Sequence, residues 1–293
     1  LYVLMMERHT CCAQTADFAG SNPAGHIATY GNSCAFDAFV VKYRYGKELI
    51  MGIKNKDIYD KIRRNNPYFE DFITRSIYHS NAIEGNAVSY AETYSIVFNQ
   101  NDMTITAKPR EIYEAINLKY ALSHVLQNLD EELSGGLMKE LAILINKNIN
   151  EIDGFRKGPV YIRGAEHIPP EAAYVPQLVQ ELLYNYRNSE GNLFCKLAEL
   201  HINFERIHPF SDGNGRTGRI LIAKELMKNG YPPLVIPLED RAKYMQFLAD
   251  QNVSGLAKYF EEKVEEERTR MQHFGISLSL SEDLVQDDYP TMR

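Results

Sequence analysis

The chain has 293 residues, of which 44% are hydrophobic and 24% charged, an ordinary composition for a globular protein with a sizeable core. Its formal net charge of −7 argues against nucleic acid as the main partner, although a local positive pocket for one nucleotide stays open. No apolar run approaches the roughly 20 residues that span a bilayer, and neither a signal peptide nor a disulfide framework is indicated, so we expect a cytoplasmic protein without a membrane partner.

The chain divides into three parts by composition. Residues 1–54 are rich in small and polar residues, and we interpret them as an N-terminal arm with room for a short hairpin. Residues 55–275 carry helical periodicity without an internal repeat or linker, which predicts one mostly helical domain. Residues 276–293 are interpreted as a polar C-terminal tail.

The first readable helix of this domain covers about residues 66–85. Six residues at helical spacing share one face: Phe69, Phe72, Ile73, Ile77, Ser80 and Glu84. Gly85 then supplies a natural helix stop. A carboxylate in the last turn opposes the helix dipole. Glu84 is therefore either a solvated residue at a frayed end, which is the simpler interpretation, or the partner of a cation on a neighbouring element.

Further helices follow, with one stretch of a different kind among them. Start signals and apolar periodicity place helices at the capping box of Ser89 and Glu92, near Arg110, after Gly135, from Val175, on either side of residues 208–219, from about Glu239 and from about Leu256. Residues 154–168 instead hold a β-prone run between glycines, which predicts a short β-hairpin.

Residues 208–219 concentrate the chemistry of the chain. They read His-Pro-Phe-Ser-Asp-Gly-Asn-Gly-Arg-Thr-Gly-Arg, a Gly-rich turn between two apolar helices. Backbone N–H groups at such a helix N-terminus bind anions. Gly213 and Gly215 permit close approach of a ligand, and with the amide of Asn214 they could form a nest for a diphosphate.

Four side chains of the same stretch suit the chemistry of a bound phosphate. Arg216 and Arg219 can donate charge-assisted, bidentate hydrogen bonds to phosphate oxygens. Asp212 can hold a hard divalent cation that bridges those oxygens. His208 has an ordinary pKa of ~6.5, which suits it to take a proton from an attacking hydroxyl.

Simpler interpretations of these residues stay open on the pattern alone. A histidine before proline is often structural, and an Asp-Gly-Asn-Gly turn can be no more than a tight loop. His201, His208 and Asp212 could instead ligate a metal, but the spacing lacks an HxxxH pattern and a second carboxylate. We expect His201, which lies on an apolar helix face, to be a core histidine with its hydrogen bonds satisfied.

Residues 208–219 resemble the signature of the Fic family, His-Pro-Phe-x-Asp/Glu-Gly-Asn-Gly-Arg-x-x-Arg, at every fixed position. The resemblance extends over roughly residues 65–270. It implies an all-α fold, a Fic-type helical bundle core with a short β-hairpin flap beside the active-site loop. It also implies protein adenylyltransferase activity (AMPylation), in which AMP passes from ATP to a Ser, Thr or Tyr hydroxyl of a target protein.

The resemblance assigns roles to the residues of the motif. His208 becomes the general base, and Asp212 positions Mg²⁺, or Mn²⁺ as an alternative, on the α- and β-phosphates. The anion hole consists of Gly213, Asn214 and Gly215. Arg216 and Arg219 contact the β- and γ-phosphates.

Two further segments resemble binding elements of the family. Val160, Tyr161, Ile162 and Arg163 resemble the flap hairpin, which clamps the nucleotide and docks an extended, hydroxyl-bearing segment of the target by strand addition. Tyr244 and Asn252 fall where the family lines the adenine pocket.

The helix at 66–85 also gains an interpretation. Ser80-Asn-Ala-Ile-Glu84-Gly85 resembles the family's inhibitory motif, Ser/Thr-x-x-x-Glu-Gly/Asn. In that motif the glutamate pairs with the second arginine of the signature, here Arg219, and prevents productive seating of the γ-phosphate. The resemblance therefore implies the class with an N-terminal inhibitory helix.

Three functions follow from these patterns. The first is a self-inhibited adenylyltransferase that uses ATP and a target protein, with self-modification and a homodimer both compatible. The second is a deAMPylase that uses Glu84 and His208 to remove AMP. The third is a catalytically silent nucleotide-binding module, against which the intact His208 and Asp212 argue.

Overall fold

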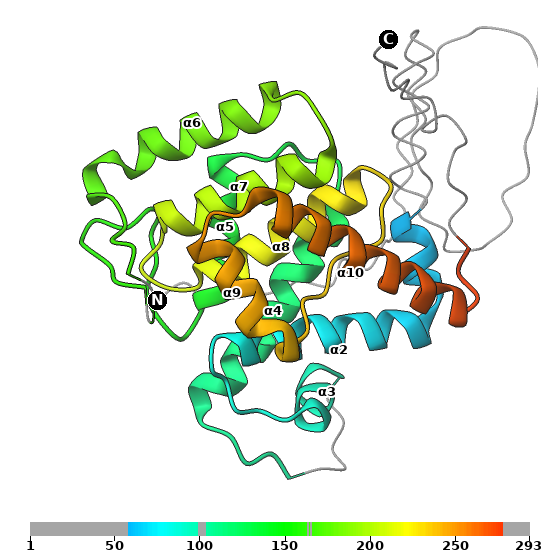
Figure 1. The fold of residues 1–293 in the computed structure, drawn as a ribbon. Helices are drawn as coiled ribbons and strands as arrows, with labels where there is room; N and C mark the ends of the chain where they lie inside the picture. Colours follow the sequence, from blue (N-terminus) through cyan, green and yellow to red (C-terminus); the bar gives the residue numbers. More distant parts are fainter. Residues whose placement is uncertain (1–57, 99–103, 163, 165, 278–293) are drawn as a thin grey trace, which may run out of the picture. The chain divides into compact units, whose positions relative to one another are not determined.

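The computed structural model describes residues 58–98, 104–162, 164 and 166–277 (Figure 1). These residues belong to one compact unit, Tyr45–Arg293. The predicted arm at 1–54 and most of the predicted tail at 276–293 lie outside the described residues. Among the described residues, none of the helices combines the length and the apolar character needed to cross a bilayer.

The described part of the chain is helical, which confirms the all-α prediction for these residues. Residues 58–64 are helical. The elements that follow are α2 (Asn66–Ile83), α3 (Tyr90–Phe98), α4 (Pro109–Gln127), α5 (Gly135–Asn146), the 3₁₀ turn η1 (Ala172–Tyr174), α6 (Val175–Asn188), α7 (Leu193–Ile207), α8 (Asn214–Lys228), η2 (Leu238–Asp240), α9 (Arg241–Ala249) and α10 (Val253–His273).

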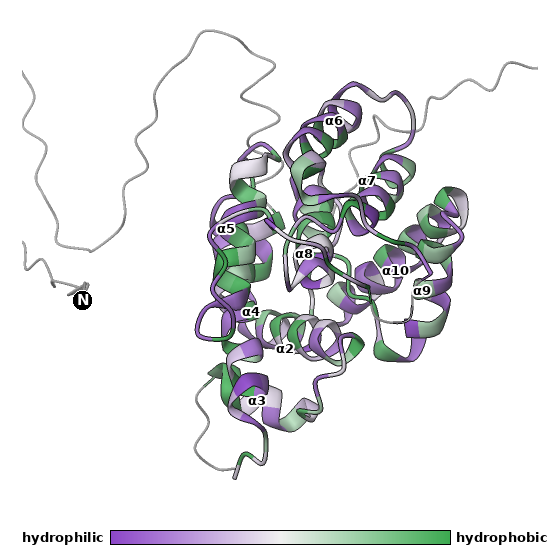
Figure 2. Ribbon diagram, turned by 90° about the vertical axis from the view of Figure 1, so that its left-hand side faces the viewer, coloured by the Kyte–Doolittle hydropathy of each residue, from purple (hydrophilic) through white to green (hydrophobic). Residues whose placement is uncertain are grey.

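Helix α8 is the centre of the bundle. Of its 15 residues, 13 are buried, including charged ones such as Arg216, Arg219 and Lys224. Helices α2, α4, α5 and α7 pack around it, and α10 and α6 lie along α7 (Figure 1). Most outer helices carry both hydrophobic and hydrophilic residues, as expected for helices with one buried face (Figure 2). The N-terminus of α8 is therefore held firmly from several sides.

Local start signals place several helices as predicted. Ser89 and Glu92 form the capping box of α3, in which Ser89 N donates to Glu92 Oε2 at 3.0 Å and Glu92 N donates to Ser89 Oγ at 3.3 Å. Pro109 opens α4, where its missing N–H costs nothing. Ser134 caps α5 through the amide of Leu137 at 3.1 Å.

The predicted β-hairpin at 154–168 is not confirmed. No strand occurs among the described residues of this segment. Tyr161 and Ile168 are 83% and 74% exposed, so the apolar side chains that made the run look β-prone have no buried face to cover. The segment is instead tied down at its start, where Arg156 N donates to Pro209 O at 2.8 Å.

Candidate active site

His208 stands at the junction between α7 and the loop that leads to α8. It caps α7 in the left-handed region, with φ 49° and ψ 62°, a conformation that costs energy for a residue with a side chain. Its Nδ1 lies 3.2 Å from the carbonyl oxygen of Glu205, so the other ring nitrogen, Nε2, is left for a ligand. Burial lowers the pKa of His208, which keeps the imidazole neutral near pH 7.

Arg156 maintains this strained junction. Its guanidinium is 6% exposed and donates to four backbone carbonyls, those of His208 at 2.8 Å, Gly158 at 3.0 Å, Ile207 at 3.3 Å, and Pro170. The side chain thus joins the end of α7 to the segment in which a flap was expected. Sequence reasoning missed Arg156, and its only signal was an arginine within an otherwise β-prone run.

The loop from 209 to 213 is closed by its own asparagine. The Asn214 side chain accepts from Phe210 N and donates to Phe210 O, both at 2.9 Å. Gly213 has φ 78° and lies next to Asn146 Nδ2 and Ile145, a position that suits glycine alone. No side chain caps α8, unlike α2, α5, α7 and α10, so its first N–H groups are available to an anion.

Arg216 and Asp212 form a charged cluster at this helix end. Arg216 is 2% exposed and contacts Asp212 Oδ1 at 3.2 Å and Glu114 Oε1 at 3.5 Å. Its Nε and Nη1 have no hydrogen-bond partner among the described residues. Nη1 still lies 3.5 Å from the Glu114 carboxylate, whereas no acceptor is found for Nε. A buried donor without an acceptor is costly, and an anion at this helix end would supply one.

The carboxylate of Asp212 receives four donors. Oδ1 accepts from Gly213 N at 2.6 Å and from Arg216, while Oδ2 accepts from Arg110 Nη2 at 2.7 Å and from Asn150. Sequence reasoning did not single out Arg110 or Asn150, because 102 and 62 positions separate them from Asp212.

Asp212 fits the chemistry of a magnesium ligand under one condition. Mg²⁺ takes one or two protein carboxylates and completes its shell with phosphate and water, so a single aspartate is enough. Arg110 donates to Oδ2 of Asp212. The half-exposed Arg110 side chain would therefore have to move before an ion could bind this oxygen. Within the described ranges no group of three histidine, cysteine or acidic side chains could hold a metal, which argues against the alternative site of His201, His208 and Asp212.

Arg219 pairs with Glu84, as the resemblance implies. Arg219 Nη2 donates to Glu84 Oε1 at 2.7 Å and to Ser80 O at 2.9 Å, and its Nε donates to Ser80 Oγ at 2.9 Å. Burial raises the pKa of Glu84, but the adjacent Arg219 outweighs this effect and the net shift is downward. The carboxylate is therefore ionised at neutral pH and paired with Arg219, so the simpler interpretation of an unpaired Glu84 at a frayed helix end is wrong.

Helix α2 ends in a Schellman motif that presents Glu84 to this arginine. Gly85 N donates to Ala82 O at 2.9 Å, Asn86 N donates to Asn81 O at 3.1 Å, and Gly85 has φ 95°. Arg241 also donates to Ile83 O at 2.8 Å. Two arginines from other helices thus meet the negative end of the α2 dipole, which removes the electrostatic objection to a glutamate at this position.

Gly215 makes room for the carboxylate of Glu84. A Cβ on residue 215 would collide with Glu84 Oε1 and would lie 3.0 Å from Arg219 Nη1. Glu84 therefore occupies the space directly beside the first turn of α8. That space is the one in which an anion bound to these amides would lie.

The structure does not bring every predicted residue to this cluster. Val160, Tyr161 and Ile162 lie in the irregular segment before residue 163, and Arg163 is outside the described residues. Tyr244 is fully buried against His201, and exposed Asn252 caps α10 by accepting from Gly255 N at 2.8 Å. The flap and adenine-pocket assignments therefore stay predictions.

His201 is a core histidine with one ring nitrogen unsatisfied. Its Nε2 lies 2.6 Å from the Tyr244 hydroxyl, but Nδ1 has no partner among the described residues. Burial, helped by Arg219, lowers the pKa of His201 to about 3, so the ring is neutral. The expectation that its hydrogen bonds are satisfied is half correct.

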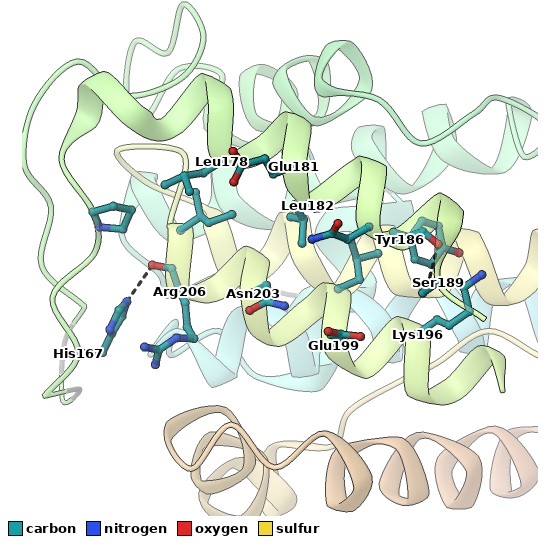
Figure 3. Close-up of a pocket in the computed structure, with 14 residues that line it drawn as sticks. His167, Leu178, Glu181, Leu182, Tyr186, Ser189, Lys196, Glu199, Asn203 and Arg206 are labelled. Carbon is teal, nitrogen blue, oxygen red and sulfur yellow. Dashed lines mark hydrogen bonds between the residues drawn. The ribbon is translucent and has the colours of Figure 1, made fainter. Parts of the chain in front are cut away.

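A groove outside the motif begins next to it. It has a volume of about 390 Å³ and lies between α6 and α7. Figure 3 shows His167 and Arg206 at one end and Ser189 and Lys196 at the other. Ile207, the residue before His208, also lines it, but no residue of 208–219 does.

The described residues form a helical bundle in which a loop that begins at His208 leads to an uncapped helix N-terminus. Residues 132–226 match the sequence model of the Fic/DOC family. This segment of the chain is therefore similar to a Fic domain.

Curated relatives agree with this assignment. The "Protein adenylyltransferase Fic" of Drosophila melanogaster and that of Drosophila virilis are each 35% identical to the chain over 182 residues, which is 59% of this chain and 36% of each relative. The chain thus spans about a third of the length of the curated relatives it matches.

Solved structures agree on the fold. A Fic-domain-containing signaling protein from Bacteroides thetaiotaomicron has a TM-score of 0.64 and 21% identity, and the match covers 77% of this chain and all of that one. Fic-1 (aa134 - 508) from C. elegans has a TM-score of 0.59 and 24% identity, with 78% and 72% covered. Both share the fold with this chain.

Proposed function

We propose that this chain is a protein adenylyltransferase that moves AMP from ATP to a hydroxyl of a target protein. The names of the curated relatives support the reaction class. The observation that carries the proposal is the uncapped N-terminus of α8, where the buried donors Arg216 Nε and Arg219 Nη1 lack acceptors, after a loop that begins at the neutral His208. That arrangement suits a triphosphate next to a base.

The reaction assigns each group a definite task. The target oxygen attacks the α-phosphorus while His208 Nε2 takes its proton, one P–O bond forms, and the bond to the β-phosphate oxygen breaks. Pyrophosphate leaves. The amides of residues 213–215, with Arg216 and Arg219, hold the phosphate oxygens and spread the charge that develops on them. Mg²⁺, when bound at Asp212, supplies further neutralisation of that charge.

We also propose that the resting chain is inhibited by the pair of Glu84 and Arg219. The 2.7 Å contact occupies one phosphate-binding arginine, and the carboxylate of Glu84 lies beside Gly215. Negative charge at this point repels the terminal phosphate of ATP. Activation then requires the end of α2 to release Arg219.

The target segment is proposed to bind at residues 160–163 as an added strand. Tyr161 is 83% exposed and Val160 and Ile162 are partly exposed, so the described residues 160–162 are open to a partner. Strand addition relies on main-chain hydrogen bonds and suits an extended peptide that carries the hydroxyl. Self-modification and a homodimer are compatible with this arrangement.

A second function is favoured by one property of Glu84. Its carboxylate is ionised and its side chain is 38% exposed, so it can accept a hydrogen bond from water and orient that water. With His208 it could remove AMP from a modified target. Incubation of a pre-modified target with Mg²⁺ and without ATP measures this reaction, and its loss in Glu84→Gly would favour removal over transfer.

Transfer itself is tested with ATP labelled in the α-phosphate. His208→Ala should abolish label transfer to protein, and Glu84→Gly should raise it. His273→Ala is the matched control, because His273 is exposed at the end of α10 and should leave the rate unchanged. Equal labelling by all four proteins would reject the assignment of roles.

A further inference from the structure

Three buried polar atoms on α7 and α8 lack a hydrogen-bond partner among the described residues. They are Glu205 Oε1, His201 Nδ1 and Arg219 Nη1. A Cβ on Gly218 would lie 2.9 Å from both Glu205 Oε1 and His201 Nδ1, so these two atoms face the same point on α8. Unpaired buried polar atoms are rare in proteins, and one of the three side chains, Glu205, also contacts the active-site histidine.

Glu205 approaches His208 from one turn earlier on α7. Its carbonyl oxygen lies 3.2 Å from His208 Nδ1, and its carboxylate Oε2 lies 3.9 Å from the same nitrogen. The carbonyl can only accept, so it fixes the tautomer with hydrogen on Nδ1. The carboxylate is then the nearest acidic group to the side of the ring opposite the reacting nitrogen.

Burial raises the pKa of Glu205 to about 8, and the negative charge of Glu84 adds to this effect while Arg219 opposes it. Arg156 is the other cation close to His208. His201 stays neutral, since its pKa is about 3. Several titratable or charged groups surround Glu205. They are His201 within α7, His208 at the end of α7, Arg219 on α8, Glu84 at the end of α2 and Tyr244 on α9.

We propose that Glu205 is a positioning residue for His208. Its carbonyl oxygen fixes the tautomer of the base, and its carboxyl group strengthens the base when it is ionised. A carboxylate 3.9 Å from Nδ1 stabilises the imidazolium that forms once Nε2 has taken the proton of the target hydroxyl. The inference rests on the proposed function only in taking His208 as the base. The location of Glu205 behind the ring does not depend on which reaction the domain performs.

The first test follows the His208 ring by NMR in the full, nucleotide-free chain. The His208 Cε1–H resonance is assigned by its loss in His208→Gln. Wild type should show a main titration step below the ordinary histidine range and a second, smaller step near pH 8 from Glu205. Glu205→Gln should remove the second step and keep the first. A single step in wild type, or a second step that survives in Glu205→Gln, would overturn the proposal.

Further variants keep the test decisive if Glu205→Gln folds poorly. Glu205→Asp retains the carboxyl and should retain the second step. Glu84→Gln removes the charge that raises the pKa of Glu205, so it should move the second step to lower pH. Glu199→Gln, an exposed change on the same helix, is the matched control and should leave both steps in place. A second step at an unchanged pH in Glu84→Gln would also count against the proposal.

Enzyme rates separate this proposal from the proposed function. The rate of label transfer in wild type should rise several-fold a second time as the pH passes 8, in kcat rather than in KM for ATP. Glu205→Gln should lose only that second rise. If no protein transfers label but the NMR step depends on Glu205 as described, the proposed function fails and the role of Glu205 stands. If transfer occurs and the pH profile of Glu205→Gln matches that of wild type, the proposed function stands and the role of Glu205 is rejected.

Discussion

Replacement of Glu84 by glutamine is the sharpest probe of the resting state. Glutamine keeps the shape of the side chain but removes the charge that Arg219 meets at 2.7 Å. Ser80 still accepts two hydrogen bonds from Arg219, so the arginine stays in place and the fold should be retained. The substitution therefore isolates the electrostatic part of the contact.

The size of the effect follows from the exposure of the carboxylate. A hydrogen bond to a charged group contributes about 1.5–3 kcal/mol. The Glu84 side chain is 38% exposed, and screening by solvent reduces the contribution to about 1–2 kcal/mol. This energy corresponds to a factor of roughly 5–30 in the population that is free to accept a triphosphate.

The measurement is the initial rate of AMP transfer to protein at ATP concentrations below saturation. Glu84→Gln should raise this rate by roughly 5- to 30-fold over wild type. Glu70→Gln is the matched control, because Glu70 lies on the same helix but binds the Tyr94 hydroxyl at 2.9 Å, away from α8. An unchanged rate in Glu84→Gln would refute the inhibitory role, and loss of AMP removal in this variant would favour the second function.

Three further outcomes follow from contacts around the site and the core. Arg110→Gln removes the cation that pairs with Oδ2 of Asp212 and leaves the hydrogen bond from Asn150. The Mg²⁺ concentration for half-maximal ATP binding, measured by calorimetry, should therefore fall about two- to fivefold, and an unchanged value would contradict the competition between Arg110 and the metal. Arg156→Lys leaves carbonyls at the His208 junction without donors and should lower the free energy of unfolding in urea by about 2–4 kcal/mol; a change within about 0.5 kcal/mol would reject its role. Burial raises the pKa of Asp71, but hydrogen bonds from two arginines outweigh this effect, and the net pKa is lowered in the folded protein. Asp71 therefore stabilises the fold at pH values above its unfolded-state pKa. This stabilisation is lost as the pH falls through the lower folded-state pKa. Asp71→Asn should therefore lose stability at pH 7 and show a smaller further loss below about pH 4 than wild type in parallel urea titrations.

Features encoded by neighbouring residues could be predicted from the sequence. The capping box of Ser89 and Glu92, the opening of α4 at Pro109 and the glycine stop after α2 depend on residues within one turn of each other. The placement of residues 208–219 in a loop between two helices likewise depended only on neighbouring residues. Apolar periodicity identified the buried faces because the outer helices bury apolar residues at helical spacing, whereas α8 is buried on nearly all sides.

Features that depend on distant contacts could not be predicted from the residues alone. The pattern left two interpretations of Glu84 open, a solvated residue at a frayed end and the partner of a cation on a neighbouring element, and only the family resemblance connected it to Arg219, 135 positions away. The partners of Asp212 come from α4 and from the loop after α5, and nothing local marks them. The hairpin prediction is not confirmed among the described residues, because β-propensity describes side chains that pack on a sheet, and Tyr161 and Ile168 face solvent.

The contact at Gly215 has a consequence for how regulation can change. Any side chain at residue 215 would evict Glu84 and at the same time fill the cradle at the start of α8, so no substitution there can separate restraint from ligand binding. Selection for a permanently active protein should therefore favour substitutions at the end of α2 and leave Gly215 unchanged. Since α2 lies outside residues 132–226, the proposed restraint comes from a part of the chain beyond the matched segment, and its electrostatic effect requires only one carboxylate next to Arg219.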